Sequence, residues 1–198
     1  MDILTGWDFD KGEDRRRAVK YVLTEKPKLV IGSPMCTLFS LLQEINIAKH
    51  GHDPEWMEAF QKRLDKAKRH IRFCIQLYKL QMSQGRYWLH EHPWSARSWR
   101  MPEMEQLAAD PRSIKVKADM CQFGLRSPIT KGGTETGPAL KPTGFMGNSW
   151  KIMERLGKRC DGKHQHVPLM EGRAAKAAEY PPLLVAVWVK NLQEHFGM

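Results

Sequence analysis

The spacing of apolar and polar residues predicts three β-strands. The run Lys28–Gly32 is apolar and β-branched and leads into a Gly-Ser-Pro segment, which is typical of a short buried strand in a parallel sheet. A second strand is expected over Arg86–Glu91, whose aromatic and apolar residues end at a His-Pro pair. The residues Ile114–Ala118 alternate and predict a third strand. Longer segments separate these strands, and most of them have helical patterns.

The longest helical pattern lies between the first two strands. From Pro54 to Gln84, apolar residues form one stripe at helical spacing, and Gly85 follows as a stop signal. Ser127–Leu140, rich in glycine, is expected to be a flexible loop. Asp14 is placed to cap the first of the other helices. These helices are expected over Asp14–Glu25, about Pro102–Ala109, about Ser149–Leu156 and about Pro182–His195.

The alternation of strands and helices predicts an α/β fold. Two strands joined by a long helix imply a right-handed crossover and a parallel sheet. With 198 residues the chain fits one ordinary domain, so a single α/β domain is expected over residues 1–198. Functional residues are then expected at the carboxyl ends of the strands.

The chain is strongly basic, with a formal net charge of +10. Its 32 Lys and Arg residues outnumber 22 Asp and Glu residues along the whole chain rather than in one tail. Such a charge suits a phosphate backbone, so nucleic acid, most simply DNA, is the expected partner, although solubility alone also explains it. The long predicted helix has a basic face that either lies along phosphates or is only solvated; it comprises Lys62, Arg63, Lys66, Lys68, Arg69 and Arg72.

The cysteines and the apolar runs indicate an intracellular protein with reduced thiols. The four cysteines are far apart and show no paired spacing, and the first residues have no signal-peptide pattern. The longest apolar run, Leu183–Val189, is far below the roughly 20 residues that cross a bilayer. We therefore expect neither a disulfide framework nor a membrane span.

Cys36 is the first candidate for chemistry. It lies just beyond the carboxyl end of the first predicted strand and just before a helix expected to start near Thr37 or Leu38. A helix N-terminus lowers the pKa of a thiol, and the thiolate is the form that attacks. The alternative is a buried structural cysteine.

Glu91 is the second candidate. It stands between His90 and His92 at the end of the second predicted strand, on the same edge of the sheet as Cys36. A partly desolvated carboxyl group there would hold a proton and act as a general acid or as a hydrogen-bond donor to a ring nitrogen. The alternative is a set of polar groups whose hydrogen bonds are satisfied within the fold.

Several segments, taken in order, resemble motifs of the cytosine-C5 DNA methyltransferases. Gly32-Ser33-Pro34-Met35-Cys36 resembles the Gly-Gly-Pro-Pro-Cys loop of that family, and Leu89-His90-Glu91-His92-Pro93 resembles its Glu-Asn-Val segment. Three further segments are similar to family motifs: Asp119–Arg126, Gly147-Asn148-Ser149, and Gly6-Trp7-Asp8. The whole chain also resembles short domains of this type found in phage genomes and in retrotransposon polyproteins.

The resemblance implies a reduced methyltransferase-type fold, with a three-layer, mostly parallel, Rossmann-like sheet and flanking helices. It implies that Cys36 attacks a flipped cytosine, that Glu91 contacts the ring and that Arg126 stabilises charge on it. S-adenosyl-L-methionine would supply the methyl group, held by Gly6, Trp7, Asp8, Asn148 and Ser149. The substrate would meet Ser33, Pro34, His90, His92, Trp94, Arg97, Trp99 and Arg100, with the two tryptophans available for bases.

The chain also departs from the family pattern. It has no Phe-x-Gly-x-Gly turn for the methyl donor, only about 28 residues precede the first strand, and Ser127–Leu140 is too short for a target-recognition domain. Met35 replaces a Pro and His92 replaces an Asn. The chain is thus a minimal enzyme, or one that a partner or dimer mate completes, or a nucleic-acid-binding domain without methyl transfer. A cysteine hydrolase that uses Cys36 and a nearby His is a further alternative.

A second set of residues has metal-ligand character. Cys160, His164 and His166 lie within seven residues on a predicted loop, and Cys121 is available as a fourth ligand. The usual Cys-x2-Cys pair is absent. The sequence alone favours polar loop residues near phosphate, with a structural zinc ion as the alternative.

Overall fold

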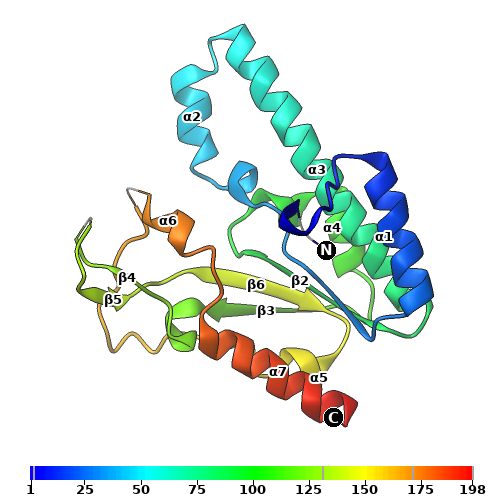
Figure 1. Cartoon of the computed structure of the whole chain (residues 1–198). Coiled ribbons are helices and arrows are strands. Elements are labelled where there is room, and N and C mark those ends of the chain that lie inside the picture. The colour runs from blue at the N-terminus through cyan, green and yellow to red at the C-terminus, as the bar shows by residue number, and fades with distance from the viewer. Residues whose placement is uncertain (2, 131, 171, 198) are drawn as a thin grey trace. The chain divides into compact units, whose positions relative to one another are not determined.

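The computed structural model describes all residues except 2, 131, 171 and 198 (Figure 1). The chain divides into two compact units, residues 1–113 and residues 114–198. Both units combine helices and strands, so the fold is α/β.

The first unit is built on two parallel strands and the helix that joins them. The strands are β1 (Leu29–Gly32) and β2 (Tyr87–Pro93), and their register runs from Leu29 opposite Tyr87 to Gly32 opposite His90. The connection contains α2 (Gln43–His50) and α3 (Pro54–Ser83), with η2 (Thr37–Phe39) before them. The other helices of this unit are η1 (Ile3–Thr5), α1 (Gly12–Glu25), η3 (Arg97–Arg100) and α4 (Pro102–Ala108).

Local chemistry explains where α3 begins. The Asp53 carboxylate accepts hydrogen bonds from the backbone N–H groups of Glu55 (2.9 Å) and Trp56 (3.2 Å), and Pro54 occupies the first helical position. The apolar stripe of α3 packs on α1 in a core of Ala18, Val22, Phe73 and Leu77. Burial of this stripe stabilises the helix more than its intrinsic propensity does.

The first helix begins differently from the prediction. α1 starts at Gly12, and Asp14 lies inside it rather than at its N-cap. The buried Asp14 carboxylate accepts a hydrogen bond from the Asp8 backbone N–H (2.8 Å) and pairs with Arg17. Asp14 therefore ties the N-terminal segment to α1, and its predicted capping role is wrong.

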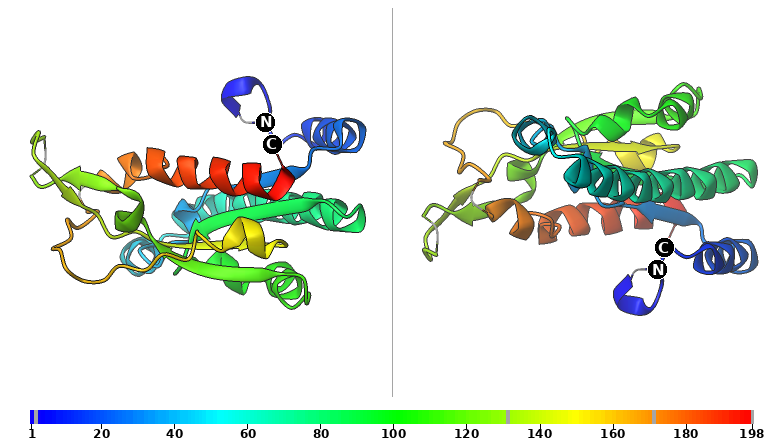
Figure 2. Two further views of the ribbon diagram at one scale, coloured as in Figure 1. Left: turned by 90° about the horizontal axis from the view of Figure 1, so that it is seen from below. Right: turned by 90° about the horizontal axis from the view of Figure 1, so that it is seen from above.

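The second unit contains antiparallel strands. β3 (Ile114–Asp119) pairs with β6 (Pro142–Gly147), and β4 (Arg126–Pro128) pairs with β5 (Thr136–Pro138). Its helices are η4 (Met120–Phe123), α5 (Trp150–Met153), α6 (Arg173–Lys176) and α7 (Pro182–Phe196). α7 runs beside α5, and the Asn191 amide donates a hydrogen bond to the Ile152 carbonyl (3.0 Å) (Figures 1 and 2).

The strand directions correct the expectation of a mostly parallel, Rossmann-like sheet. In the described part of each unit, β1 and β2 form a parallel pair and the other two strand pairs are antiparallel, so the strand arrangement is mixed and mostly antiparallel. The segment expected to be a flexible loop contains the β4–β5 hairpin. β6 was not predicted because its proline and two glycines give it no strand composition. No helix among the described residues is both long enough and apolar enough to cross a membrane.

Candidate functional site

The parallel pairing of β1 and β2 brings two predicted site segments to one edge. Gly32, the last residue of β1, lies opposite His90, so the residues after each strand continue from the same edge. The His92 side chain reaches across this edge, and its Nε2 lies 3.0 Å from the Pro34 carbonyl oxygen. Because a carbonyl only accepts, Nε2 carries the proton in this bond. The loop of Cys36 is thus fastened directly to β2.

Cys36 lies at the start of a short turn. It is the N-cap of η2, a three-residue 3-10 helix, and its carbonyl accepts a hydrogen bond from the Phe39 N–H (2.9 Å). The thiol is half-buried and forms no disulfide. The predicted helix at this position is therefore a single turn, which offers only a small dipole to a thiolate.

Cys74 provides a contrast. It is buried in α3, and desolvation raises the pKa of its thiol to about 12. A thiol with this pKa stays protonated at neutral pH and is a poor nucleophile. Of the two cysteines in the first unit, Cys36 is the one that reagents in solvent reach.

The two histidines that flank Glu91 support the fold of this edge. His90 and His92 are fully buried on one face of β2, with ring centroids 5.2 Å apart. His90 Nδ1 lies 2.9 Å from the Tyr78 hydroxyl of α3, and His92 Nδ1 lies 2.5 Å from the Ser98 hydroxyl of η3. His92, with a partner at each ring nitrogen, thus fits the alternative that the sequence left open, in which polar groups are satisfied within the fold.

Glu91 lies between these histidines and is 7% exposed. Because side chains alternate along a strand, its carboxyl group points to the opposite face of β2. Burial so close to the strand end is unusual for a glutamate, which rarely leaves water without a specific role. The Glu91 backbone follows His90, which lies opposite Gly32 at the end of β1.

The residues after β2 divide into packed and accessible ones. The Trp99 indole N–H donates to the Pro93 carbonyl (2.8 Å), and its ring meets His90 edge-on with centroids 5.3 Å apart. Arg97 forms an ion pair with Glu44 of α2. Trp94, 37% exposed, and the exposed Arg100 remain accessible to a ligand.

A cavity of about 510 Å³ lies beside the Cys36 loop. Met35 and Thr37, the two neighbours of Cys36 in the sequence, line it together with Trp7 and Asp8 of the N-terminal segment. Its remaining lining residues are Phe9, Asp10, Leu38, Arg63, Lys66, Ala67 and His70. Two of the residues predicted to hold a methyl donor therefore border the same cavity as the cysteine loop.

The walls of this cavity carry charge of both signs. Asp10 pairs with Lys66 (3.3 Å) and lies 3.9 Å from Arg69, while the Arg17 guanidinium lies 4.0 Å from the Trp7 ring centroid. Burial lowers the pKa of His70, and the nearby Asp10 carboxylate partly offsets this effect. Gly6, the first residue of the predicted Gly6-Trp7-Asp8 segment, has a positive φ of 82°, and its carbonyl accepts a hydrogen bond from Arg17.

The basic face of α3 is partly neutralised. Lys62 pairs with Glu58, and Arg72 pairs with Glu103 of α4 (2.7 Å). With Lys66 and Arg69 facing Asp10, four of the six predicted cations already have acidic neighbours. Among the described residues, this leaves the exposed Arg63 and the half-buried Lys68 without an ion pair of this kind.

Three predicted site residues belong to the second unit. The exposed Arg126 guanidinium donates to the Thr136 hydroxyl (3.0 Å) and to the Thr136 carbonyl (2.6 Å) across the β4–β5 hairpin. Asn148 is half-buried, and the buried Ser149 is the N-cap of α5. Arg126 therefore stabilises the hairpin in this structure.

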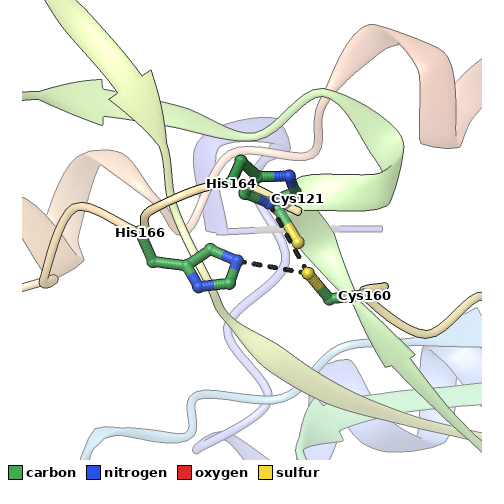
Figure 3. A group of neighbouring side chains, drawn as sticks. All are labelled: Cys121, Cys160, His164 and His166. Carbon is green, nitrogen blue, oxygen red and sulfur yellow. Dashed lines mark hydrogen bonds between the residues drawn. The ribbon is translucent and has the colours of Figure 1, made fainter. Parts of the chain in front are cut away.

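The second unit also brings together Cys121, Cys160, His164 and His166 (Figure 3). One ligand atom from each residue lies within 4.8 Å of all the others, and all four residues are half-buried. Cys160 Sγ lies 3.6 Å from His164 Nε2 and 3.4 Å from His166 Nε2. The proximity of Cys121 could not be seen in the sequence, because β4, β5, β6 and α5 lie between it and the other three residues.

Asp119, at the end of β3, holds the Cys160 segment in place. Its carboxylate accepts hydrogen bonds from the Arg159 guanidinium (2.8 Å) and from the Cys160 N–H (2.9 Å). Burial raises the pKa of Asp119, but these hydrogen bonds outweigh that effect and hold the pKa below its usual value. Burial, and then the neighbouring Cys160, raise the pKa of Cys121 to about 11.

Comparison of this chain with family models, with curated proteins and with solved structures gives no match.

Proposed function

We propose that the chain acts on DNA as a reduced enzyme of the cytosine-C5 methyltransferase type, with Cys36 as the nucleophile. The single observation that carries the proposal is the loop of Cys36, fixed to β2 by the bond between His92 and the Pro34 carbonyl (3.0 Å). This bond keeps the half-buried Cys36 at the edge of the sheet where β2, the strand of Glu91, ends. A nucleophile and a carboxyl group at one strand edge suit covalent chemistry on a base.

The proposed reaction proceeds by covalent addition to cytosine, methyl transfer and elimination. The Cys36 thiolate adds to C6 of a cytosine that has been flipped out of its stack, and the electron pair moves to C5. Glu91 supports the ring at its nitrogen. C5 would take the methyl group from the sulfonium of S-adenosylmethionine, so that the S–CH3 bond breaks and the donor leaves as a neutral thioether. Loss of the C5 proton to a base then restores the double bond and expels the Cys36 thiolate.

The cavity beside the loop fits a methyl donor of nucleoside size. Its volume of about 510 Å³ lies within the range of roughly 300–1,000 Å³ that is usual for small-molecule sites. Trp7 offers an aromatic surface for a base, and Asp8 offers a carboxylate for ribose hydroxyls. S-adenosylmethionine, when bound, would supply the methyl group.

Contacts with DNA would come from the accessible residues near the site. Trp94 is suited to stack on a base or to fill the space that a flipped base leaves. Arg63 and Arg100 are exposed cations that suit phosphates. Arg126 is proposed to stabilise the negative charge that develops on the ring, as the family resemblance implies.

A second candidate function is a nucleic-acid-binding domain that keeps the base pocket without methyl transfer. The missing Phe-x-Gly-x-Gly turn favours it, because that turn allows a backbone to approach the methyl donor closely. A cysteine hydrolase has less support. Both ring nitrogens of His92 face other groups, Ser98 and Pro34, rather than the thiol of Cys36.

Methyl transfer from labelled S-adenosylmethionine to unmethylated DNA tests the proposal. The wild-type protein is expected to label DNA, and Cys36→Ser should reduce labelling to background, because a hydroxyl cannot replace the thiolate as attacking group. His52→Ala, an exposed substitution outside the site, serves as the control and should keep full activity. DNA binding without labelling would favour the second function, and absence of S-adenosylmethionine binding would exclude the methyltransferase.

A further inference from the structure

The Cys121, Cys160, His164 and His166 cluster has the dimensions of a tetrahedral metal site. Zinc bonds of about 2.3 Å to sulfur and about 2.0 Å to nitrogen place neighbouring S and N ligands about 3.5 Å apart in a tetrahedron. The two distances from Cys160 Sγ to the histidine Nε2 atoms are 3.6 and 3.4 Å. Both imidazoles direct the same nitrogen at one sulfur, as they would toward a shared ion.

Hydrogen bonding alone explains this convergence poorly. A Cys160 thiol has one proton to donate, yet two Nε2 atoms and the Gly162 N–H lie within 3.6 Å of its sulfur. The His164 and His166 rings meet edge-on, with centroids 4.6 Å apart. A cation between the four ligand atoms would satisfy both nitrogens and both sulfurs at once.

The surroundings hold the ligands in place before any ion binds. Asp119 accepts the Cys160 N–H, and the Asp119 N–H donates to the Lys158 carbonyl (2.9 Å). Beyond His166, the Val167 N–H donates to the Pro138 carbonyl of β5 (2.8 Å). The ligand segment is therefore anchored on both sides, on β3 and on β5.

The same segment lacks regular structure of its own. Residues 157–170 form no helix or strand, and irregular segments of this length are uncommon in compact units unless they are functional or fastened by other means. A metal ion that joins this segment to Cys121 of η4 would fasten it.

We propose that Cys121, Cys160, His164 and His166 bind one zinc ion that stabilises the second unit. Two thiolates and two imidazoles are a donor set that zinc prefers, and two thiolates balance the charge of Zn²⁺. Four protein ligands complete the coordination sphere and leave no open position for a substrate. The ion therefore has a structural role, independent of the chemistry proposed for Cys36.

Metal content and spectroscopy of the full chain test the site. We expect one zinc ion per chain after purification without added metal, and removal of zinc by a chelator should lower the midpoint of thermal unfolding. Cobalt added to the metal-free protein should give thiolate-to-cobalt charge-transfer bands and the intense visible bands of a tetrahedral site. Absence of both zinc and the cobalt spectrum in the wild-type protein would overturn the proposal.

Substitutions separate this site from that of Cys36. Cys160→Ala should lower zinc affinity at least 100-fold. Asp119→Asn, which keeps all four ligands but weakens the bonds of Asp119 to Arg159 and Cys160, should lower it about 10-fold. Cys36→Ala removes a thiol of similar exposure and should leave zinc content unchanged. Zinc affinity that is equal in wild type and Cys160→Ala would contradict the assignment, as would a Cys121–Cys160 disulfide in protein purified under reducing conditions.

The His164→Cys variant keeps the test valid if removal of a ligand unfolds the chain. It replaces one nitrogen ligand by a sulfur, so cobalt should still bind, with a stronger thiolate charge-transfer band. An unchanged cobalt spectrum would show that His164 is not a ligand and would overturn the four-residue site.

Discussion

Replacing Gly32 by alanine is expected to destabilise the first unit by about 3 kcal/mol or more. An added Cβ would lie 1.9 Å from the Tyr78 hydroxyl oxygen and 2.9 Å from its ring carbon Cζ. Tyr78 cannot yield easily, because its ring is fully buried, stacks on Trp88 with centroids 4.7 Å apart and bonds to His90. Glycine is thus required at this position by space, since its φ is not positive.

Urea unfolding of Gly32→Ala measures this cost. The matched control is Gly157→Ala, where the nearest atom to an added Cβ is 3.6 Å away, an ordinary contact. Combining Gly32→Ala with Tyr78→Phe removes the closest clash and should recover part of the lost stability. Equal stabilities of Gly32→Ala and Gly157→Ala would show that Tyr78 does not pack against β1 in this way.

Replacing His92 by alanine is expected to cost about 2–4 kcal/mol and to release the Cys36 loop. The substitution removes a fully buried ring and leaves the Pro34 carbonyl and the buried Ser98 hydroxyl without their bonds to it. Because the loop then loses its fastening to β2, Cys36 should react faster with a thiol reagent while any base chemistry is lost.

Two measurements on His92→Ala check this expectation. One is urea unfolding, and the other is the rate at which Cys36 reacts with a disulfide reagent under folding conditions. His52→Ala, an exposed histidine outside this edge, should change neither quantity. An unchanged Cys36 rate in a destabilised His92→Ala protein would show that His92 supports the core but not the loop.

The first unit could be predicted largely from sequence because its signals are local. The β-branched run of β1 and the regular apolar stripe of α3 define one strand and the crossover helix, and the parallel pairing of β1 with β2 follows from them. The same reasoning fails for β6. Its six residues contain Pro142 and two glycines, and only pairing with β3, which is distant in sequence, makes them a strand.

The two sites also depend on contacts between residues that are distant in sequence, which sequence patterns do not predict. The order of strands and loops along the chain is enough to predict that Cys36 and the strand of Glu91 share one edge of the sheet. This prediction does not depend on where side chains lie. The structural role of His90 and His92 could not be predicted from the sequence. Their hydrogen-bond partners Tyr78, Ser98 and Pro34 come from three different segments. The Cys160, His164 and His166 spacing was visible, but the fourth ligand comes from η4 and is found only by folding.

Covalent trapping on DNA tests the central claim most directly. DNA that contains 5-fluorocytosine lacks the C5 proton whose loss would release the enzyme, so an attacking cysteine stays attached to the base once the methyl group has been transferred. With S-adenosylmethionine present, the wild-type protein should form an adduct that survives denaturing electrophoresis. The adduct should be absent with Cys36→Ala and should persist with His52→Ala. A folded wild-type protein that binds this DNA without forming an adduct, or an adduct that remains in Cys36→Ala, would contradict the account.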